Sequence, residues 1–277
     1  MYTLLIAALA GIATAGGLIA SWNRPILSTL AGLLVFLAVT LVVNLLFRKK
    51  IQAVFEAAQK HILEAQEDIQ RQVRMIQAKN LGASKGLQKQ LEKTQEDSFR
   101  LAIAELDNAS VYERWNFLVA KQANTLRARL YYQMRDDANT DRCFANILPL
   151  RILPDPIIAA MRLVRLWKQG KTEEMKTYFK KAVAVFKDEK ASLLYATYSW
   201  ILVKENLIDE AIVVLDEGKE KTENETLRQN WDHLVNGRAR RFSNAPLGEQ
   251  WYALLLEEPK QVRVRQQSHF GQKMRRH

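Results

Sequence analysis

Two long uncharged apolar runs open the chain, and a link of only three residues separates them. As a helix, residues 2–22 rise about 1.5 Å each and reach about 32 Å, which matches a hydrocarbon core about 30 Å thick. Residues 26–47 form a second run of the same length class. Because Asn23, Arg24 and Pro25 are the whole link, we expect an antiparallel transmembrane hairpin within residues 1–50, with Pro25 opening its second helix.

The distribution of basic residues predicts how this hairpin is oriented. Arg48, Lys49 and Lys50 follow the second run, whereas the link carries only Arg24. Basic residues concentrate on the cytoplasmic side of membrane proteins, so we expect both termini and the rest of the chain to be cytoplasmic. The predicted location is a membrane, with the bacterial inner membrane as the natural setting for so compact an anchor.

The first run has an alternative interpretation as a cleaved signal peptide. Ala13, Thr14 and Ala15 form a small-x-small site, but no basic residue precedes the apolar core, as one usually does in secretory signals. The small residues also have a packing interpretation. Ala13 and Gly17 lie four residues apart on one helix face, which would allow close approach to the second run or to another copy.

Residues 51–107 are predicted to form a helical spacer. Phe55, Ile62, Ile69 and Ile76 recur every seven residues, which predicts one apolar seam on a helix that continues from the membrane. A self-associating coiled coil and packing onto the rest of the protein explain this seam equally well. The segment 80–86 (NLGASKG) indicates a break, and a second helix is expected to resume at Leu87.

Residues 108–259 show a repeat when the sequence is shifted by 36 residues. The shift aligns Met175 with Ala211 and Leu247, and it aligns Phe179 with Leu215 and Trp251. Each unit is predicted to be a helix, a short turn and a helix. A further degenerate unit precedes these three, with Ala123, Leu126 and Leu130 on its first helix, Cys143 near its second, and Pro154–Pro156 at its end.

These units resemble the tetratricopeptide repeat (TPR), a pair of antiparallel helices of about 34 residues. The best match covers residues 194–223 and carries Tyr195, Tyr198, Ser199, Leu202, Ala211, Leu215 and Gly218. Leu163 stands where the family has a small residue, and Lys187 stands at its closing proline. The resemblance implies an all-α solenoid of about three imperfect helix pairs that docks a peptide or protein; an irregular helical domain would share the same helix lengths.

The resemblance also implies which side chains face a partner. The first helices line the inner surface of such solenoids, and the positions carried over to this chain are Trp167, Lys168, Trp200, Lys204 and Arg240. The three basic residues recur at the 36-residue period, so we expect a basic ladder that suits an acidic peptide or a free carboxyl terminus. The alternative is that the cations are solvated helix ends and that the tryptophans pack between units.

Residues 260–277 are predicted to be a disordered basic tail without acidic residues. Anionic lipid is the nearest polyanion for a membrane-anchored chain, and nucleic acid is an unlikely partner because no binding motif accompanies the tail. A solvated tail with no ligand is the other interpretation. The candidate lipid-surface residues are Lys260, Arg263, Arg265, Lys273, Arg275 and Arg276.

Catalysis, cofactors and metals find no support in the sequence. The four histidines are scattered, the chain has one cysteine, and no phosphate loop, GxSxG elbow or HExxH helix occurs. The expected function is therefore that of a non-enzymatic adaptor that binds or positions a partner protein at the membrane. The alternative is a structural or assembly subunit that its hairpin holds within a larger membrane complex.

Overall fold

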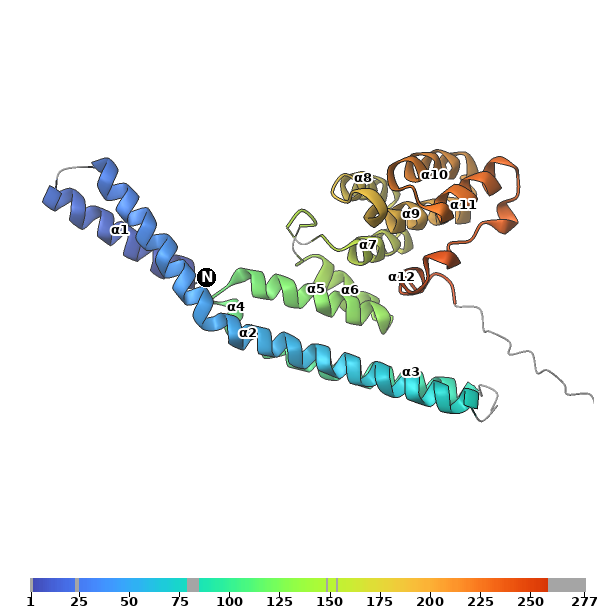
Figure 1. Cartoon of the computed structure of the whole chain (residues 1–277), viewed down its shortest axis with the longest axis horizontal. Coiled ribbons are helices and arrows are strands. Elements are labelled where there is room, and N and C mark those ends of the chain that lie inside the picture. Colours follow the sequence, from blue (N-terminus) through green and yellow to red (C-terminus); the bar gives the residue numbers. More distant parts are fainter. Residues whose placement is uncertain (1, 23–24, 79–84, 148, 153, 259–277) are drawn as a thin grey trace, which may run out of the picture.

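The computed structural model describes residues 2–22, 25–78, 85–147, 149–152 and 154–258 (Figure 1). Every regular element in those residues is a helix, which confirms the prediction of an all-helical chain. The two apolar helices project from one end of the molecule, and the short helices of the carboxyl-terminal half gather at the other (Figure 1).

Helices α1 (Tyr2–Trp22) and α2 (Pro25–Ala78) pack side by side in the apolar part of the molecule. Both are long and apolar enough to cross a membrane, judged by length and composition. Only 17% of the most apolar window of α1 and 6% of that of α2 is buried within the protein. Exposed apolar patches beyond a few hundred Å² are rare on soluble monomers, so this surface calls for a lipid or protein covering.

The two apolar helices approach most closely at a pair of glycines. A Cβ atom built on Gly32 would lie 2.5 Å from the carbonyl oxygen of Gly11 and 2.8 Å from the Cβ of Ala15. The predicted contact through Ala13 and Gly17 is wrong for this helix pair, because Ala13 is exposed and nothing lies within 4 Å of a Cβ on Gly17. Gly11 and Ala15, which contact Gly32, have the same four-residue spacing as Ala13 and Gly17, but they lie on the face of α1 that points to α2.

This close approach predicts the effect of a bulky residue at the crossing. Gly32→Ile should force α1 and α2 apart and lower stability by about 1–3 kcal/mol, as overpacking usually does. Gly17→Ile is the matched control, because it has the same change in helix propensity but meets open space. Thermal unfolding of the detergent-solubilised chain measures both, and equal melting temperatures would rule out the glycine contact.

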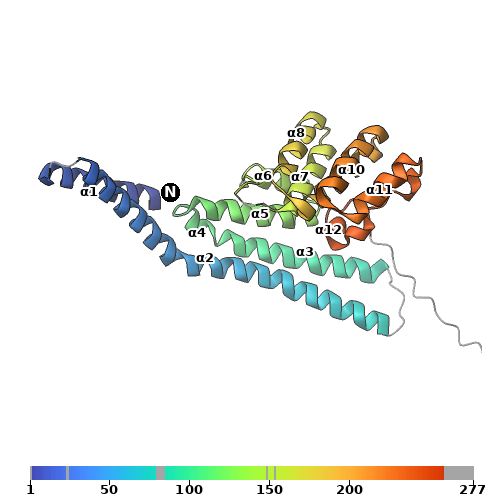
Figure 2. The ribbon, with the colours of Figure 1, turned by 45° about the horizontal axis from the view of Figure 1, so that its top comes forward.

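Helix α2 continues without a break beyond the apolar run, and α3 (Lys85–Asp107) returns alongside it (Figure 2). Segment 51–107 is therefore a helical hairpin whose second helix returns toward the apolar pair, so the segment that follows begins beside the start of α1. Phe55 and Ile62 of the predicted seam pack within the chain, against α3 and α5 (Phe117–Gln133), whereas the side chain of Ile76 lies outside the described part of the chain. The core that they help to form includes Phe55, Ala58, Ile62, Phe99, Ala102, Ile103, Leu106, Leu126 and Leu130.

A second hairpin connects this region to the repeats. The short α4 (Ser110–Glu113) is followed by α5, and α5 packs against α6 (Asp137–Phe144). Side-chain caps start both helices: Asn116 accepts a hydrogen bond from the N–H of Leu118, and Asp136 accepts one from that of Asn139. Cys143 is buried in the core of this pair.

Two regular helix pairs follow at the predicted 36-residue spacing. They are α7 (Pro156–Lys168) with α8 (Thr172–Val183), and α9 (Ser192–Lys204) with α10 (Ile208–Thr222). Gly218 of α10 lies against the ring of Tyr195 of α9, where an added Cβ would come within 2.8 Å. A small residue is required there because the two helices are in close contact.

The third unit differs from the prediction. Helix α11 (Glu225–Val235) ends before Gly237, whose φ of +66° is left-handed, and two 3₁₀ turns replace the expected second helix. A buried amide network fixes this loop: Asn230 donates to Asn244, and Asn244 donates to the carbonyl of Ala196 in α9. After α11, the unit has only the four residues of α12 (Glu249–Tyr252) in an α-helix, yet Trp251 is fully buried in the core.

Candidate partner-binding face

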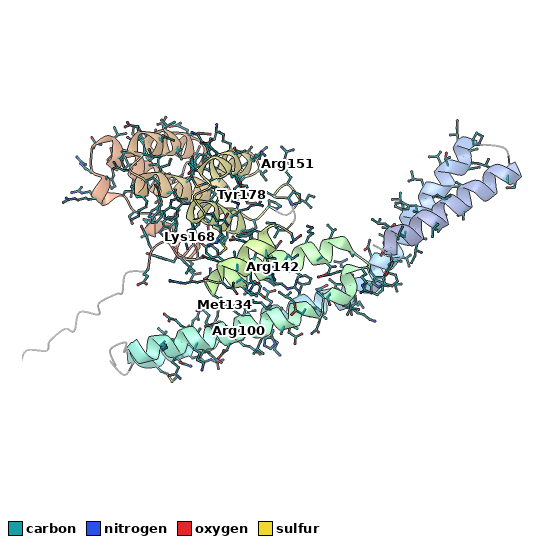
Figure 3. All side chains as sticks on the ribbon, turned by 180° about the vertical axis from the view of Figure 1, so that it is seen from behind. Arg100, Met134, Arg142, Arg151, Lys168 and Tyr178 are labelled. Carbon is teal, nitrogen blue, oxygen red and sulfur yellow. The ribbon has the colours of Figure 1, made fainter. Side chains whose placement is uncertain are left out.

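The predicted basic and aromatic residues meet where α7 and α9 end. Lys168 and Lys204 are the last residues of these two packed helices, and both are exposed. Figure 3 labels Lys168 on this part of the molecule. The rings of Trp167 and Trp200 lie edge to face, with centroids 5.6 Å apart. The structure therefore brings four of the five predicted residues together.

Trp200 is only 6% exposed because the carboxyl-terminal segment 249–258 packs against it. Its indole N–H donates to Oε1 of Glu257 at 2.7 Å, and the indole N–H of Trp251 donates to Oε2 of the same carboxylate at 3.0 Å. The two indole rings are 6.0 Å apart. Trp200 thus packs inside the domain, as the alternative interpretation proposed, and a partner cannot reach it while segment 249–258 stays in place.

Trp167 and Lys204 are held by local contacts but keep exposed surface. The indole N–H of Trp167 donates to the carboxylate of Glu205 at 2.7 Å, which connects the end of α7 to the residue that caps α9. The ammonium of Lys204 lies 4.9 Å from the centroid of the Trp200 ring, within the range of a cation–π contact. Both residues therefore have a partner within the domain, and Trp167 is next to the exposed Lys168.

Arg240 does not occupy a helix position that matches the two lysines. Helix α11 ends at Val235, and Arg240 lies exposed in the following 3₁₀ turn, Ala239–Arg241. The predicted ladder of three equivalent helix positions is wrong at this third position, because Gly237 ends the helix early. The three predicted cations are therefore two lysines at helix ends and an arginine on a turn.

The carboxyl-terminal segment is also anchored on the neighbouring hairpin. The hydroxyl of Tyr132 donates to the carbonyl of Leu254 at 2.6 Å, and the amide of Gln133 donates to the carbonyl of Ala253 at 2.7 Å. Burial raises the pKa of Tyr132, so its hydroxyl stays protonated and remains a donor. Segment 249–258 therefore joins the end of α5 to α9.

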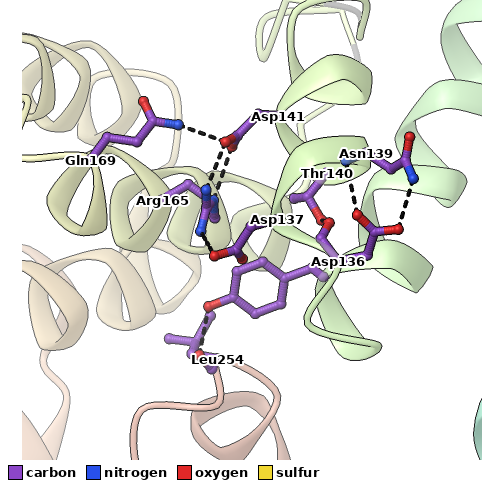
Figure 4. Close-up of polar contacts among 9 residues, drawn as sticks. Asp136, Asp137, Asn139, Thr140, Asp141, Arg165, Gln169 and Leu254 are labelled. Carbon is purple, nitrogen blue, oxygen red and sulfur yellow. Dashed lines mark hydrogen bonds and ion pairs between the residues drawn. The ribbon is translucent and has the colours of Figure 1, made fainter.

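A buried arginine joins the same hairpin to α7 (Figure 4). Arg165 is 6% exposed, and its guanidinium bonds both carboxylate oxygens of Asp141, at 2.9 and 2.6 Å, and also pairs with Asp137. Hydrogen bonding to Asp141 raises the pKa of Arg165. Gln169 donates to the same aspartate. All of these groups are engaged with one another, so the cluster is structural.

Sequence reasoning missed an open groove between α8 and α10. Its volume is about 670 Å³. Val213 lines it and is 67% exposed, and a valine among the acidic residues on this face of α10 is the sequence signal for the groove. The apolar lining residues are Phe179, Val183, Tyr198, Val213 and Val214, and the basic ones are Lys176, Lys180 and Lys221.

Acidic residues share this groove, so it is not a purely basic surface. Asp209, Glu210 and Glu217 line it alongside the three lysines. Hydrogen bonding from Lys221 lowers the pKa of Glu217, which also accepts a hydrogen bond from the hydroxyl of Tyr195. The charges that line the groove balance one another, so a ligand would bind there mainly through apolar contact area.

Within the described residues, no group of three or more His, Cys, Asp or Glu side chains is placed to hold a metal ion. The predicted lipid-surface residues of the tail, at positions 260–276, lie outside the described part of the chain. No protein-family model, curated protein or solved structure matches this chain.

Proposed function

We propose that this chain is a membrane-anchored adaptor. Its α1–α2 hairpin spans a membrane, of the bacterial inner-membrane type, and its TPR-like helix pairs bind or position a partner protein on the cytoplasmic side. The observation that carries the proposal is the continuity of α2, one helix from Pro25 to Ala78 that belongs both to the outward-facing apolar pair and to the core of the domain. Such a helix fixes the domain relative to its anchor.

The partner is expected to contact the exposed basic residues at the ends of α7 and α9 and on the turn after α11. Lys168, Lys204 and Arg240 present cations, and Trp167, next to Lys168 at the end of α7, adds apolar surface. Cations of this kind suit an acidic peptide segment, and a fixed aromatic ring beside them supplies contact area at low entropic cost. The α8–α10 groove offers further apolar area on the same helix pairs.

Crosslinked pull-down from intact membranes tests this proposal with the full chain. Reversing the charge of Lys168, Lys204 and Arg240 to glutamate should reduce capture of the dominant partner at least about tenfold, since several charged contacts would become repulsive. The matched control reverses three other exposed cations, Arg151, Lys187 and Lys190. Equal capture by the two triple variants would reject the acidic-peptide surface.

The alternative of a structural subunit is supported by the outer face of α1. Ala13, Gly16 and Gly17 are exposed there, and a face of small residues allows another membrane helix to approach closely. In that case Gly17→Ile should abolish co-purification of integral membrane proteins, while the triple charge reversal should leave it unchanged. The opposite pattern favours the adaptor.

A further inference from the structure

The beginning of α1 is joined to a segment more than a hundred residues away. The backbone N–H of Tyr2 donates to the carbonyl of Arg114 at 2.8 Å, and the hydroxyl of Thr3 donates to the carbonyl of Trp115 at 2.6 Å. The first N–H groups of a helix have no partner within it, and such groups are costly to leave unpaired near hydrocarbon. The α4 region therefore caps the first apolar helix.

Aromatic rings surround this junction at the level where both apolar helices meet the domain. The ring of Trp115 lies 5.6 Å from that of Tyr2, at the start of α1, and 5.1 Å from that of Phe47, at the end of the apolar run of α2. Tyr112 is 5.9 Å from Phe47. The amide of Asn116 also donates to the side chain of Asn44. Aromatic residues concentrate at the interface between hydrocarbon and water, so this ring cluster marks that level.

A cavity of about 900 Å³ opens beside the cluster. Tyr2, Trp115 and the 66%-exposed Val111 give it an apolar side. Arg114 and Lys121 give it two cations, against the single carboxylate of Glu113.

More positive charge lies on the adjacent part of α2. Arg48, Lys49 and Lys50 directly follow Phe47, and all three are exposed. Around the cavity, positive charge and an apolar wall therefore meet at the end of two apolar helices. A phosphodiester joined to acyl chains would complement both features, because its phosphate carries negative charge and its chains are apolar.

We propose that this cavity binds the headgroup of an anionic phospholipid. Arg114 and Lys121 contact the phosphate, Trp115 and Tyr2 lie at the level of the glycerol, and Val111 contacts the acyl chains. The proposal rests on the membrane anchoring proposed above. It assigns the lipid contact to the α4–α5 junction, which is separate from the basic tail.

The test uses the full chain in nanodiscs made from equal parts of phosphatidylcholine and phosphatidylglycerol. Native mass spectrometry of the released protein counts the lipids that stay bound. Neutralising two cations near an anionic surface, in Arg114→Gln with Lys121→Gln, should reduce retained phosphatidylglycerol about tenfold. Arg142→Gln with Lys187→Gln is the matched control, because both residues are exposed on the helical domain, and it should behave as the wild type. Equal retention by the two double variants overturns the proposal.

A second variant tests the same cavity in case the double variant does not fold. Val111 is 66% exposed, so Val111→Asn should leave the fold intact and still lower retention by removing the acyl contact. Inorganic phosphate, added to the chain in neutral micelles, tests whether the site binds free phosphate in place of a lipid headgroup. Binding of phosphate alone, with no preference for phosphatidylglycerol over phosphatidylcholine, would overturn the lipid assignment.

The membrane anchor itself is checked separately by washing membranes at alkaline pH. A chain released by the wash contradicts the proposed membrane function and, with it, the lipid site. A chain that resists the wash but shows no difference between the double variants contradicts the headgroup site alone.

Discussion

Replacing Trp251 with alanine is expected to lower the stability of the helical domain by about 3–5 kcal/mol, the usual cost of truncating a fully buried tryptophan. The side chain is completely buried, packs against the ring of Trp200, and donates a hydrogen bond to Glu257. For a domain of this size the loss corresponds to a melting temperature lower by about 10 °C. Thermal unfolding followed by circular dichroism measures the change.

Two controls show whether the loss of stability comes from the packing of segment 249–258 on α9. Trp251→Phe keeps a buried aromatic ring but loses the hydrogen bond and part of the buried indole, so its cost should be smaller, about 1–2 kcal/mol. Val235→Ala removes methyl groups from a side chain that is 49% exposed, and it should have almost no effect. If Trp251→Ala unfolds at the wild-type temperature, the segment does not pack on α9 as described.

Replacing Arg165 with alanine is expected to cost about 2–4 kcal/mol. The substitution removes a buried guanidinium and leaves the carboxylates of Asp137 and Asp141 close together with no cation between them. The side chains of these aspartates are 55% and 34% exposed, so water relieves part of the repulsion. The expected cost is therefore lower than the ~3–5 kcal/mol that breaking a fully buried pair usually costs.

A double-mutant cycle between Arg165→Met and Asp141→Asn isolates the ion pair from the packing of the arginine stem. Methionine keeps much of the buried volume, and asparagine keeps the shape of the aspartate. We expect the double variant to be more stable than the sum of the single losses by about 1–3 kcal/mol, the range of coupled contacts. Strict additivity would show that the pair does not join α6 to α7.

Helix periodicity predicted much of this fold because local spacing records which face is buried. The 36-residue shift aligned Phe179 with Leu215 and Trp251, and all three are buried, even though the third lies in a four-residue helix and not in a full one. The period of the repeat therefore identifies core positions. Whether a helix forms around them depends on local backbone signals such as Gly237.

The features that sequence reasoning missed depend on contacts between distant segments. Trp200 has the residue type and position of a binding residue, but segment 249–258, about fifty residues later, covers it. Trp115 lies far from the apolar runs in sequence and reaches Phe47 only because α3 folds back along α2. The cluster of Arg165 with Asp137 and Asp141 could have been predicted from the sequence. Arg165 lies one helical turn beyond Met161 on the apolar stripe of α7, and an arginine in such a stripe needs acidic partners.

The most direct test of the membrane-anchored arrangement is the accessibility of single cysteines in intact cells. Cys143, the only cysteine, is buried and can be changed to serine, after which Asn23→Cys places a thiol in the link between α1 and α2. Lys190→Cys places one at an exposed position between α8 and α9. If α1 and α2 span the membrane with the helical domain inside, a membrane-impermeant maleimide should label position 23 from outside and position 190 only after the membrane is permeabilised. Labelling of both positions from the same side of the membrane would contradict it.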